Sequence, residues 1–344
     1  MIRKYTFKEA LDYQKFLDSF QDIYLFYAQR KYIDSLIQTF ECEEETLIYE
    51  EEGEIKGVLP LLSKLGSFGK VYNSLPFYGS HGGVIAKTNV ISQIIYDHIL
   101  SPRFGDGKKA LIMISENPFY PINTTINLPS NLIIENRIIQ VTPLEELKTE
   151  ERLMSILHSK TRNMVRKSLN VGFTLIESET LFDAMYALHV ENMNAIGGTI
   201  KPLAFYNSIR SNYRFGIDYT IIGAEYNGEL AGVLLLFYHN GIVDYHTPTI
   251  DVKYRDLQPN SFLIFHSMMS AIKSGYKFWN WGGTWKTQES LYRFKSRWGS
   301  IDKEYRYIFD VGRKDIFDSN PTTLLNEYSF FYTVPFYMLK KTCE

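Results

Sequence analysis

The sequence predicts an α+β protein in which one folding unit, a mixed sheet covered by helices, occurs twice. Residues 53–59 (GEIKGVL) return as residues 228–234 (GELAGVL), 175 positions later in a chain of 344. Each copy follows a strand-like run and a turn dipeptide, Glu52-Gly53 or Asn227-Gly228, as in a β-hairpin. Because strand, turn and strand recur in the same order, we interpret the match as an internal repeat.

Hydrophobic periodicity gives the order of elements in the first half. We expect helices and strands in the following order: helices at 6–20 and 22–40, strands at 46–51 and 55–62, a Gly-rich apolar stretch at 65–85, a helix at 90–100, and strands at 110–115 and 131–141. A helical stretch at 143–169 follows. We place the domain boundary within it, so the predicted domains are residues 1–150 and 151–344.

The second half repeats the mixture of strands and helices. The expected elements are a strand at 173–177, helices at 179–194 and 202–211, strands at 219–226, 229–238 and 242–249, a helix at 261–274, a strand at 276–280, a helix at 288–297 and a strand at 303–309. Strand runs surrounded by helices, with a central meander, favour a mixed sheet covered on both faces.

Composition narrows the possible partners and compartments. The net charge is -2, so no overall field favours DNA, and any polyanion must bind at a local patch. Cys42 and Cys343 are far apart and lack metal-ligand spacing, which predicts no metal site and a reducing cytoplasm. The apolar segment 328–339 is too short to span a bilayer, so it either docks as a C-terminal helix or rests on a membrane surface.

A basic stretch at 158–168 is the first candidate site. It carries four cations and no acid, and on a helix Lys160 and Lys167 share one face while Arg162 and Arg166 share another. Such a stretch is often only a solvated helix face. Without nearby acids, however, Arg and Lys side chains suit phosphate oxygens, so we expect Lys160, Arg162 and Arg166 to bind substrate.

A Trp- and Gly-rich segment at 279–285 (WNWGGTW) is the second candidate site. An apolar strand ends there at Gly282-Gly283-Thr284, and paired glycines allow a ligand or another backbone to approach closely. The helix expected next contains Phe294 and Lys295. The alternative interpretation is a structural turn whose tryptophans fill the core.

Two further segments contain polar candidates. A loop in the first half places Tyr78, Ser80 and His81 between small residues, a composition suited to binding through backbone N–H groups. In the second half, Asp244, Tyr245 and His246 lie on a predicted strand, and Asn260 begins the next helix. A lone His on a strand is more often a hydrogen-bonded core residue than a general base.

The second half resembles the FemAB-like branch of the GNAT acyltransferase superfamily. The resemblance covers about residues 155–300 and rests on residues 160–167, 228–234, 257–260, 280–284 and 291–295. It implies two tandem GNAT-like domains, which agrees with the internal repeat. It also implies transfer of an acyl group to an amine, with Lys295 of the Phe294-Lys295 pair near the reacting ester, where a cation would stabilise an oxyanion. His246, Asp244 or a water chain would take the proton of the amine.

The donor stays open at this point. The resemblance implies acyl-CoA, or aminoacyl-tRNA with a peptidoglycan precursor as acceptor, and the acceptor class is a small-molecule or lipid-linked glycan or peptide precursor that bears an amine. Residues 255–260 lack the spaced glycines of the usual pyrophosphate loop, and the long helical hairpin of some tRNA-dependent members is missing. A third possibility is a non-catalytic module that binds a phosphorylated glycan. The expected location is the cytoplasm, either free or at the inner face of the membrane.

Overall fold

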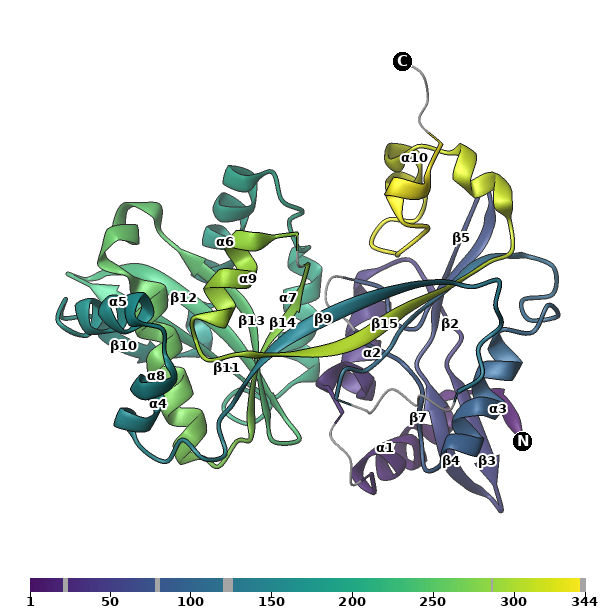
Figure 1. Ribbon diagram of the computed structural model, residues 1–344, viewed down its shortest axis with the longest axis horizontal. Helices are drawn as coiled ribbons and strands as arrows, with labels where there is room; N and C mark the ends of the chain where they lie inside the picture. Colours follow the sequence, from purple (N-terminus) through teal and green to yellow (C-terminus); the bar gives the residue numbers. More distant parts are fainter. Residues whose placement is uncertain (21–23, 78–80, 120–125, 286, 341–344) are drawn as a thin grey trace. The chain divides into compact units, whose positions relative to one another are not determined.

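The computed structural model describes residues 1–20, 24–77, 81–119, 126–285 and 287–340, and it contains two compact units. Unit 1 consists of Met1–Arg137 and Glu304–Glu344, and unit 2 of Ile138–Lys303. This division differs from the predicted boundary at residue 150. Strand β9 (Ile133–Pro143) joins the sheet of unit 2 with its second half, and strand β15 (Ile301–Val311) returns the chain to unit 1 (Figure 1).

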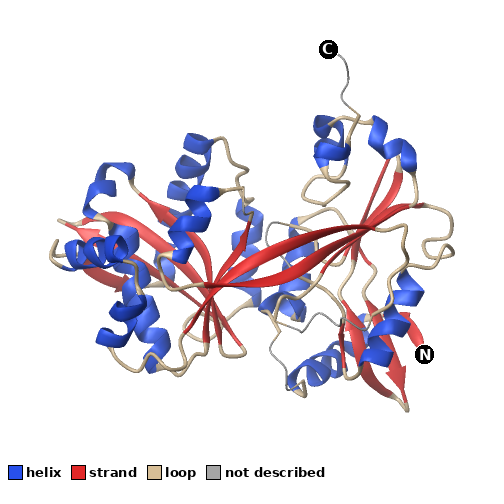
Figure 2. Cartoon of the chain, in the orientation of Figure 1, coloured by secondary structure: helices blue, strands red, loops and turns tan. Residues whose placement is uncertain are grey.

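Unit 1 combines two groups of strands with helices, and Figure 2 shows strands and helices interspersed. Its strands have the orders β1-β3-β4-β7 and β15-β8-β6-β5-β2. Besides β15, the strands are β1 (Ile2–Lys4), β2 (Glu43–Glu44), β3 (Leu47–Glu51), β4 (Glu54–Leu59), β5 (Leu62–Gly66), β6 (Gly69–Asn73), β7 (Ile85–Ala86) and β8 (Lys109–Ser115). The α-helices are α1 (Ala10–Asp18), α2 (Arg30–Thr39), α3 (Asn89–Ile99) and α10 (Pro321–Glu327).

Unit 2 is built on strands in the order β10-β11-β12-β13-β14-β9. The strands not yet given are β10 (Thr174–Glu177), β11 (Tyr219–Tyr226), β12 (Glu229–His239), β13 (Ile242–Ile250) and β14 (Phe278–Thr284). The α-helices are α4 (Glu150–Ile156), α5 (Ser159–Leu169), α6 (Phe182–Ile196), α7 (Leu203–Asn212), α8 (Pro259–Lys273) and α9 (Glu289–Ser296).

The two faces of the unit 2 sheet are covered by different helices (Figure 1). On one face, Leu153 of α4, Val165 of α5 and Met268 of α8 belong to one buried cluster with Leu236 of β12. The next residue along β12, Phe237, points to the opposite face, because side chains alternate along a strand. There it contacts Tyr213, directly after α7, with ring centroids 5.4 Å apart. The mixed, two-sided sheet predicted for this half is confirmed.

The internal repeat is confirmed in the geometry of two hairpins. Between β3 and β4, Glu52 and Gly53 have φ of 53° and 78°, and between β11 and β12, Asn227 and Gly228 have 51° and 82°. Two consecutive positive φ angles are the mark of the tight turn that suits strand twist. Both hairpins also contain a bulge at the matching position, where the register skips Lys56 in the first and Ala231 in the second. The repeat therefore extends to a backbone irregularity that the sequence match did not reveal.

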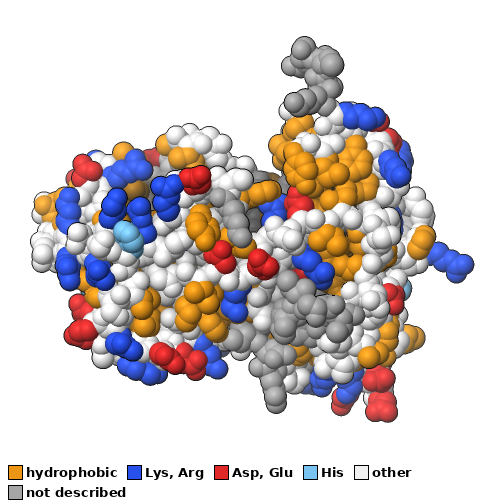
Figure 3. All heavy atoms as spheres, in the orientation of Figure 1, with side chains coloured by type: hydrophobic (Ala, Val, Ile, Leu, Met, Phe, Trp, Pro, Cys, Tyr) orange, Lys and Arg blue, Asp and Glu red, His pale blue; other side chains and the backbone are white. Residues whose placement is uncertain are grey.

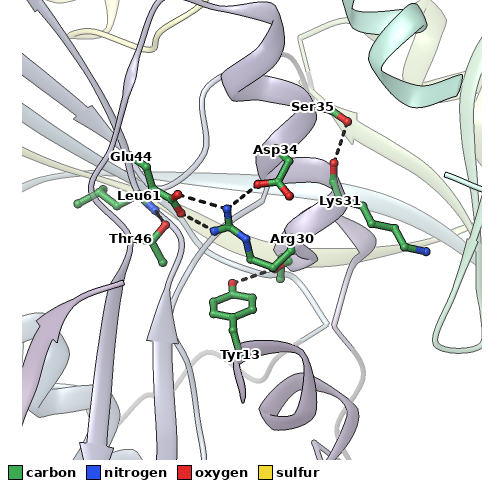
Figure 4. A network of polar contacts seen from close by, with 9 residues as sticks. Tyr13, Arg30, Lys31, Asp34, Ser35, Glu44, Thr46 and Leu61 are labelled. Carbon is green, nitrogen blue, oxygen red and sulfur yellow. Dashed lines mark hydrogen bonds and ion pairs between the residues drawn. The ribbon is translucent and has the colours of Figure 1, made fainter. Parts of the chain in front are cut away.

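A buried ion network joins α2 to β2 in unit 1 (Figure 4). The Arg30 guanidinium donates two hydrogen bonds to the Glu44 carboxylate and one, of 2.6 Å, to Asp34. Its Cζ atom lies 4.2 Å from the centroid of the Tyr5 ring. Nearby, the Tyr13 hydroxyl donates a 2.9 Å hydrogen bond to the Ala28 carbonyl. The Arg30 side chain is 10% exposed, so these partners, in place of water, stabilise its charge.

We expect Arg30→Met to lower the free energy of unfolding by about 2–3 kcal/mol. Removing one partner of a buried ion pair costs more than that when the other partner is fully buried. Glu44 and Asp34 are 22% and 38% exposed, so water offsets part of the loss. Urea unfolding would measure the change. As a control, Lys15→Met removes a cation that is 74% exposed and should change stability by less than about 0.5 kcal/mol. Equal midpoints for both variants would contradict a stabilising role for Arg30.

The C-terminal segment of unit 1 carries exposed apolar side chains. Leu325, Phe336 and Tyr337 are 50%, 42% and 74% exposed, and Figure 3 shows hydrophobic side chains gathered around α10. The expected helix at 328–339 is only a short 3-10 turn, Phe336–Met338. Across the described ranges, no helix combines the length and apolar character needed to cross a bilayer. Contact with a membrane surface stays a prediction.

Candidate functional site

The centre of unit 2 contains a fork between two parallel strands. Strands β13 and β14 pair only over Ile242–Asp244 and Phe278–Asn280. Beyond these residues β14 stays with β9, since Gly283 pairs with Ile139, whereas β13 stays with β12. The inner backbone groups of the two strands therefore stop bonding to each other at Asp244 and Asn280. We call this point the fork. Backbone donors and acceptors released in this way need other partners than the neighbouring strand.

Asp244 is a buried carboxyl at the fork, 3% exposed. The Asn280 side-chain amide donates a 2.5 Å hydrogen bond to Asp244 Oδ1, and Asn280 Oδ1 accepts one of 2.9 Å from the Gly282 backbone N–H. Within the described ranges, Asp244 Oδ2 has no hydrogen-bond partner. Burial raises the pKa of Asp244 to about 7, and the hydrogen bond from Asn280 opposes this increase. The carboxyl therefore changes charge near neutral pH.

Lys295 of α9 reaches the end of β14 and is 4% exposed. Its ammonium donates hydrogen bonds to the carbonyls of Gly282 and Gly283, at 3.2 and 2.9 Å, and to Thr284 Oγ1 at 2.6 Å. Three acceptors match the three protons of an ammonium group. Burial nevertheless lowers the pKa of Lys295 to about 7, so its charge also changes near neutral pH.

The backbone of residues 280–284 explains why both groups converge there. Gly282 has a φ of 74°, a left-handed conformation that glycine adopts without steric cost. This conformation lets one carbonyl face Lys295 while the N–H bonds to Asn280. Because Thr284 Oγ1 accepts from Lys295, its own hydroxyl proton is free to be donated elsewhere. The arrangement provides a buried cation, an oriented hydroxyl and a buried carboxyl on one strand and its neighbours.

Phe294 and the tryptophans support this strand end from the α8 side of the sheet. The Phe294 and Trp281 rings lie edge to face with centroids 5.9 Å apart, and Trp281 donates a 2.9 Å hydrogen bond to Thr142. Trp279 and Trp298 are fully buried. Trp279 and Trp281 therefore fill the core, as the alternative interpretation held, whereas Trp285 is 50% exposed. The carbonyls of the glycines beside them bond to Lys295.

Tyr245 and His246 separate to opposite faces beyond the fork. The Tyr245 hydroxyl accepts a 3.0 Å hydrogen bond from the Asn260 amide at the start of α8. His246 stacks on Phe205 of α7, with centroids 5.9 Å apart, and its Nδ1 lies 2.8 Å from Thr247 Oγ1. Asp244 and His246, both predicted as proton acceptors, thus belong to different hydrogen-bond groups. Burial, with the charge of Lys201, holds the pKa of His246 well below its usual value.

The predicted basic stretch forms α5, on the side of unit 2 where Figure 3 shows Lys and Arg side chains gathered. His158 caps the helix by accepting a 3.2 Å hydrogen bond from the Lys160 N–H. Arg162 donates to the Met154 carbonyl at 3.4 Å, while Lys160 and Arg166 are exposed. Within the described ranges, none of these three cations has an ion-pair partner. Their role in substrate binding stays a prediction.

The predicted loop of the first half lies in unit 1 and is only partly visible. Tyr78 and Ser80 lie outside the described residues. His81 is 2% exposed, and its ring contacts Tyr27 and Tyr305 with centroids 5.6 and 4.7 Å apart. These contacts are those of a core aromatic residue.

Sequence reasoning did not single out three residues near these groups. Asn280 belongs to the segment 279–285 that the sequence singled out. Its position between Trp279 and Trp281 did not indicate that its side chain would bond to Asp244 on another strand. His189 on α6 and Lys201 after it are 12 positions apart, and no local pattern connects them. Their proximity depends on how the α6–α7 loop folds.

Comparisons with known proteins bear on the fold and on unit 2. Residues 157–296 match the family model described as an acetyltransferase (GNAT) domain. No curated protein matches the chain. The similar solved structures include a crystal structure of FemX, 14% identical, which covers 92% of this chain and 98% of its own with a TM-score of 0.69.

Two further structures extend this likeness. The C-terminal domain of a putative lysylphosphatidylglycerol synthetase from Agrobacterium fabrum is 12% identical and covers 92% of this chain and 96% of its own, with a TM-score of 0.57. A tandem GNAT protein from the clavulanic acid biosynthesis pathway is 8% identical and covers 90% of this chain and 98% of its own, with a TM-score of 0.52. The predicted fold of two tandem GNAT-like domains is confirmed.

Proposed function

We propose that this protein is an N-acyltransferase, because residues 157–296 match the model of a GNAT acetyltransferase domain and the fold of the chain is similar to that of FemX. The observation that carries the proposal is the fork. There Lys295 and Asp244, both with a pKa near 7, are connected through Gly282 and Asn280 by a chain of hydrogen bonds. Paired titratable groups of this kind are typical of acid–base and acyl-transfer sites.

The proposed reaction begins with an acceptor amine that must lose a proton. Asp244, ionised above its pKa, takes this proton, because a base is most effective when its pKa is near the working pH. The neutral amine nitrogen then attacks the donor carbonyl carbon, and the C–N bond forms as the carbonyl oxygen becomes an oxyanion and the nitrogen becomes positively charged. The Thr284 hydroxyl donates to this oxyanion, and the Lys295 cation, whose three protons are already donated within the site, stabilises it through its charge. Collapse breaks the bond to the leaving thiolate or alkoxide, and the proton that the nitrogen then releases passes through solvent to this leaving group.

We propose acyl-CoA as the donor and an amine on a cell-envelope or surface-polysaccharide precursor as the acceptor. The exposed cations of α5, Lys160 and Arg166, together with Arg162, suit the phosphates of a CoA-like donor or of a nucleotide- or lipid-linked acceptor. The hydrogen-bonded pair Tyr245 and Asn260 lies next to the fork. We assign the pair to substrate binding along with the backbone of Gly282 and Gly283 and the Phe294 ring.

Aminoacyl-tRNA is the second candidate donor. The turn that precedes α8 supports it, because Gln258 adopts a left-handed conformation with φ of 66° and Pro259 begins the helix. Proline has no N–H, so this turn offers fewer backbone donors to a pyrophosphate than a glycine loop does. One neighbour, the lysylphosphatidylglycerol synthetase domain, takes its name from a lipid that carries a lysyl group.

Calorimetric titration with acetyl-CoA, followed by CoA, would test the donor. We expect saturable micromolar binding, about -8 kcal/mol. The double variant Lys160→Met/Arg166→Met should bind at least about tenfold more weakly, because each lost charge-assisted hydrogen bond is worth about 1.5–3 kcal/mol. Lys148→Met, which removes another exposed lysine of unit 2, is the matched control and should bind as the wild type does.

Each other outcome of the titration has a defined meaning. If neither ligand releases heat at several temperatures, acyl-CoA is excluded as donor. Transfer from charged tRNA is then assayed with and without ribonuclease. Binding of acetyl-CoA without turnover on any amine would indicate a non-catalytic binding module and contradict the proposed function.

A further inference from the structure

A second polar cluster of unit 2 lies on the sheet face covered by α6 and α7. The His189 ring, on α6 and 4% exposed, accepts a 3.1 Å hydrogen bond at Nε2 from the Lys201 backbone N–H. This bond fixes the neutral tautomer of His189, with its proton on Nδ1. The loop after α6 is thereby held against the helix, so the Lys201 side chain starts beside the imidazole.

Strand β13 contributes His246 and Thr247 to the same cluster. The β12–β13 register shifts between Leu235–Thr247 and Leu236–Tyr245, so His246 is the extra residue of a bulge. Bulges turn a side chain away from the regular alternation. His246 and Thr247 consequently both contact α7, where Thr247 Oγ1 lies 3.3 Å from the Tyr206 hydroxyl.

The cluster holds positive charge and no neutralising acid. Burial lowers the pKa of Lys201 to about 8 without any opposing effect of a carboxylate, and Lys201 in turn lowers the pKa of both imidazoles, after burial itself. In the part of the chain that the structure describes, no hydrogen bond or ion pair involves the Lys201 ammonium. A half-buried ammonium of this kind is costly unless a ligand supplies the counter-charge.

We propose that His189, Lys201 and His246 form a binding pocket for an anionic oxygen group, a carboxylate or a phosphate, on the acceptor. That the bound molecule is the acyl acceptor rests on the proposed function, whereas the anion site itself does not. His246 follows Asp244 by two residues, about 7 Å along a strand. The acceptor is therefore an amine with an acidic group only a few bonds away, so that the amine meets Asp244 while the acid meets Lys201.

NMR of protein with 15N-labelled histidine tests the pocket directly. The probes are sodium phosphate and sodium acetate, with sodium chloride at equal ionic strength to correct for screening. We expect saturable shifts of the His189 and His246 signals, assigned with the variants His189→Gln and His246→Gln. The anion that saturates at the lower concentration identifies the acidic group. Linear, non-saturating shifts with both probes would overturn the proposal.

Two variants separate the pocket from general charge effects. Lys201→Met should raise the half-saturating anion concentration at least about tenfold, because it removes the only full charge of the trio at neutral pH. Lys148→Met loses the same charge elsewhere and should titrate as the wild type does. If Lys201→Met does not fold, Lys201→Gln provides the same comparison. Unchanged saturation in the folded variant would exclude Lys201 as the binding group.

These experiments distinguish a failure of the anion pocket from a failure of the proposed acyltransferase function. Saturable histidine shifts in a protein that neither binds acetyl-CoA nor transfers an acyl group would support the anion pocket and contradict the acyltransferase. Acyl transfer to amines that carry no acid, with no preference for acidic amines and no histidine shifts, would overturn the pocket and leave the acyltransferase intact.

Discussion

Replacement of Lys295 by Ala is expected to lower kcat/KM for acyl transfer by about 100- to 1000-fold. Loss of one preorganised oxyanion donor typically has an effect of this size. The change removes the buried cation, and it also leaves Thr284 Oγ1 without the 2.6 Å hydrogen bond that orients its hydroxyl. Steady-state kinetics with saturating acceptor would measure the loss, which should appear in kcat rather than in KM.

Two companion variants make this result interpretable. Lys295→Met keeps most of the side-chain volume and should be as inactive as Lys295→Ala, which excludes a cavity as the cause. Arg293→Met lies two residues away on α9, removes a cation that is 63% exposed, and should retain activity. If Lys295→Ala folds and keeps full activity, Lys295 has no catalytic role and the oxyanion function must be assigned elsewhere.

Replacement of Asp244 by Asn is expected to stabilise the protein at neutral and alkaline pH while reducing its activity. The pKa of Asp244 is raised from 3.8 to about 7, so between these values the folded state binds a proton that the unfolded chain has released. The stability contributed by this carboxyl is therefore fully present below pH 3.8 and is lost as the pH rises through 7. The difference corresponds to roughly 4 kcal/mol, which Asn, always neutral, does not lose.

Denaturant unfolding of both proteins at pH 4.5, 7 and 9 provides the test. The variant should exceed the wild type by only about 1 kcal/mol at pH 4.5 and by up to about 4 kcal/mol at pH 9. Lys295 has the opposite dependence, since a pKa lowered from 10.5 to about 7 makes stability rise with pH between those values. Because both proteins contain Lys295, its contribution cancels when the free energy of unfolding of the wild type is subtracted from that of the variant. A variant less stable than the wild type at pH 9 would show that Asp244 is not a strained, protonatable carboxyl.

Local patterns predicted the elements well, and the misses have nonlocal causes. Strand β11 has the predicted bounds, and the predicted strand at 276–280 continues to Thr284. The continuation depends on Gly283 pairing with Ile139, which is distant in sequence. The predicted domain boundary differs from the observed division for the same reason, because the hydrogen bonds of β9 and β15 decide which unit each residue joins.

In the candidate site, too, local sequence patterns did not predict contacts between residues that are distant in sequence. The sequence predicted that Lys295 and residues 282–284 belong together, and the hydrogen bonds of the Lys295 ammonium confirm that they are in contact. It left Asp244, His246 and a water chain open as the acceptor of the amine proton. The bulge at His246 and the amide of Asn280 separate Asp244 from His246, and neither feature has a signature within a single strand.

The discontinuity of unit 1 has a consequence for biosynthesis. Strand β8 bonds to β15, and Asn73 bonds to the backbone of Tyr332, so unit 1 needs residues that are made after unit 2. Unit 2 is one uninterrupted segment, Ile138–Lys303, and is complete earlier. Domains generally fold as units during synthesis. The middle segment of the chain can therefore fold before unit 1, whose N-terminal segment must wait for strand β15 to be made.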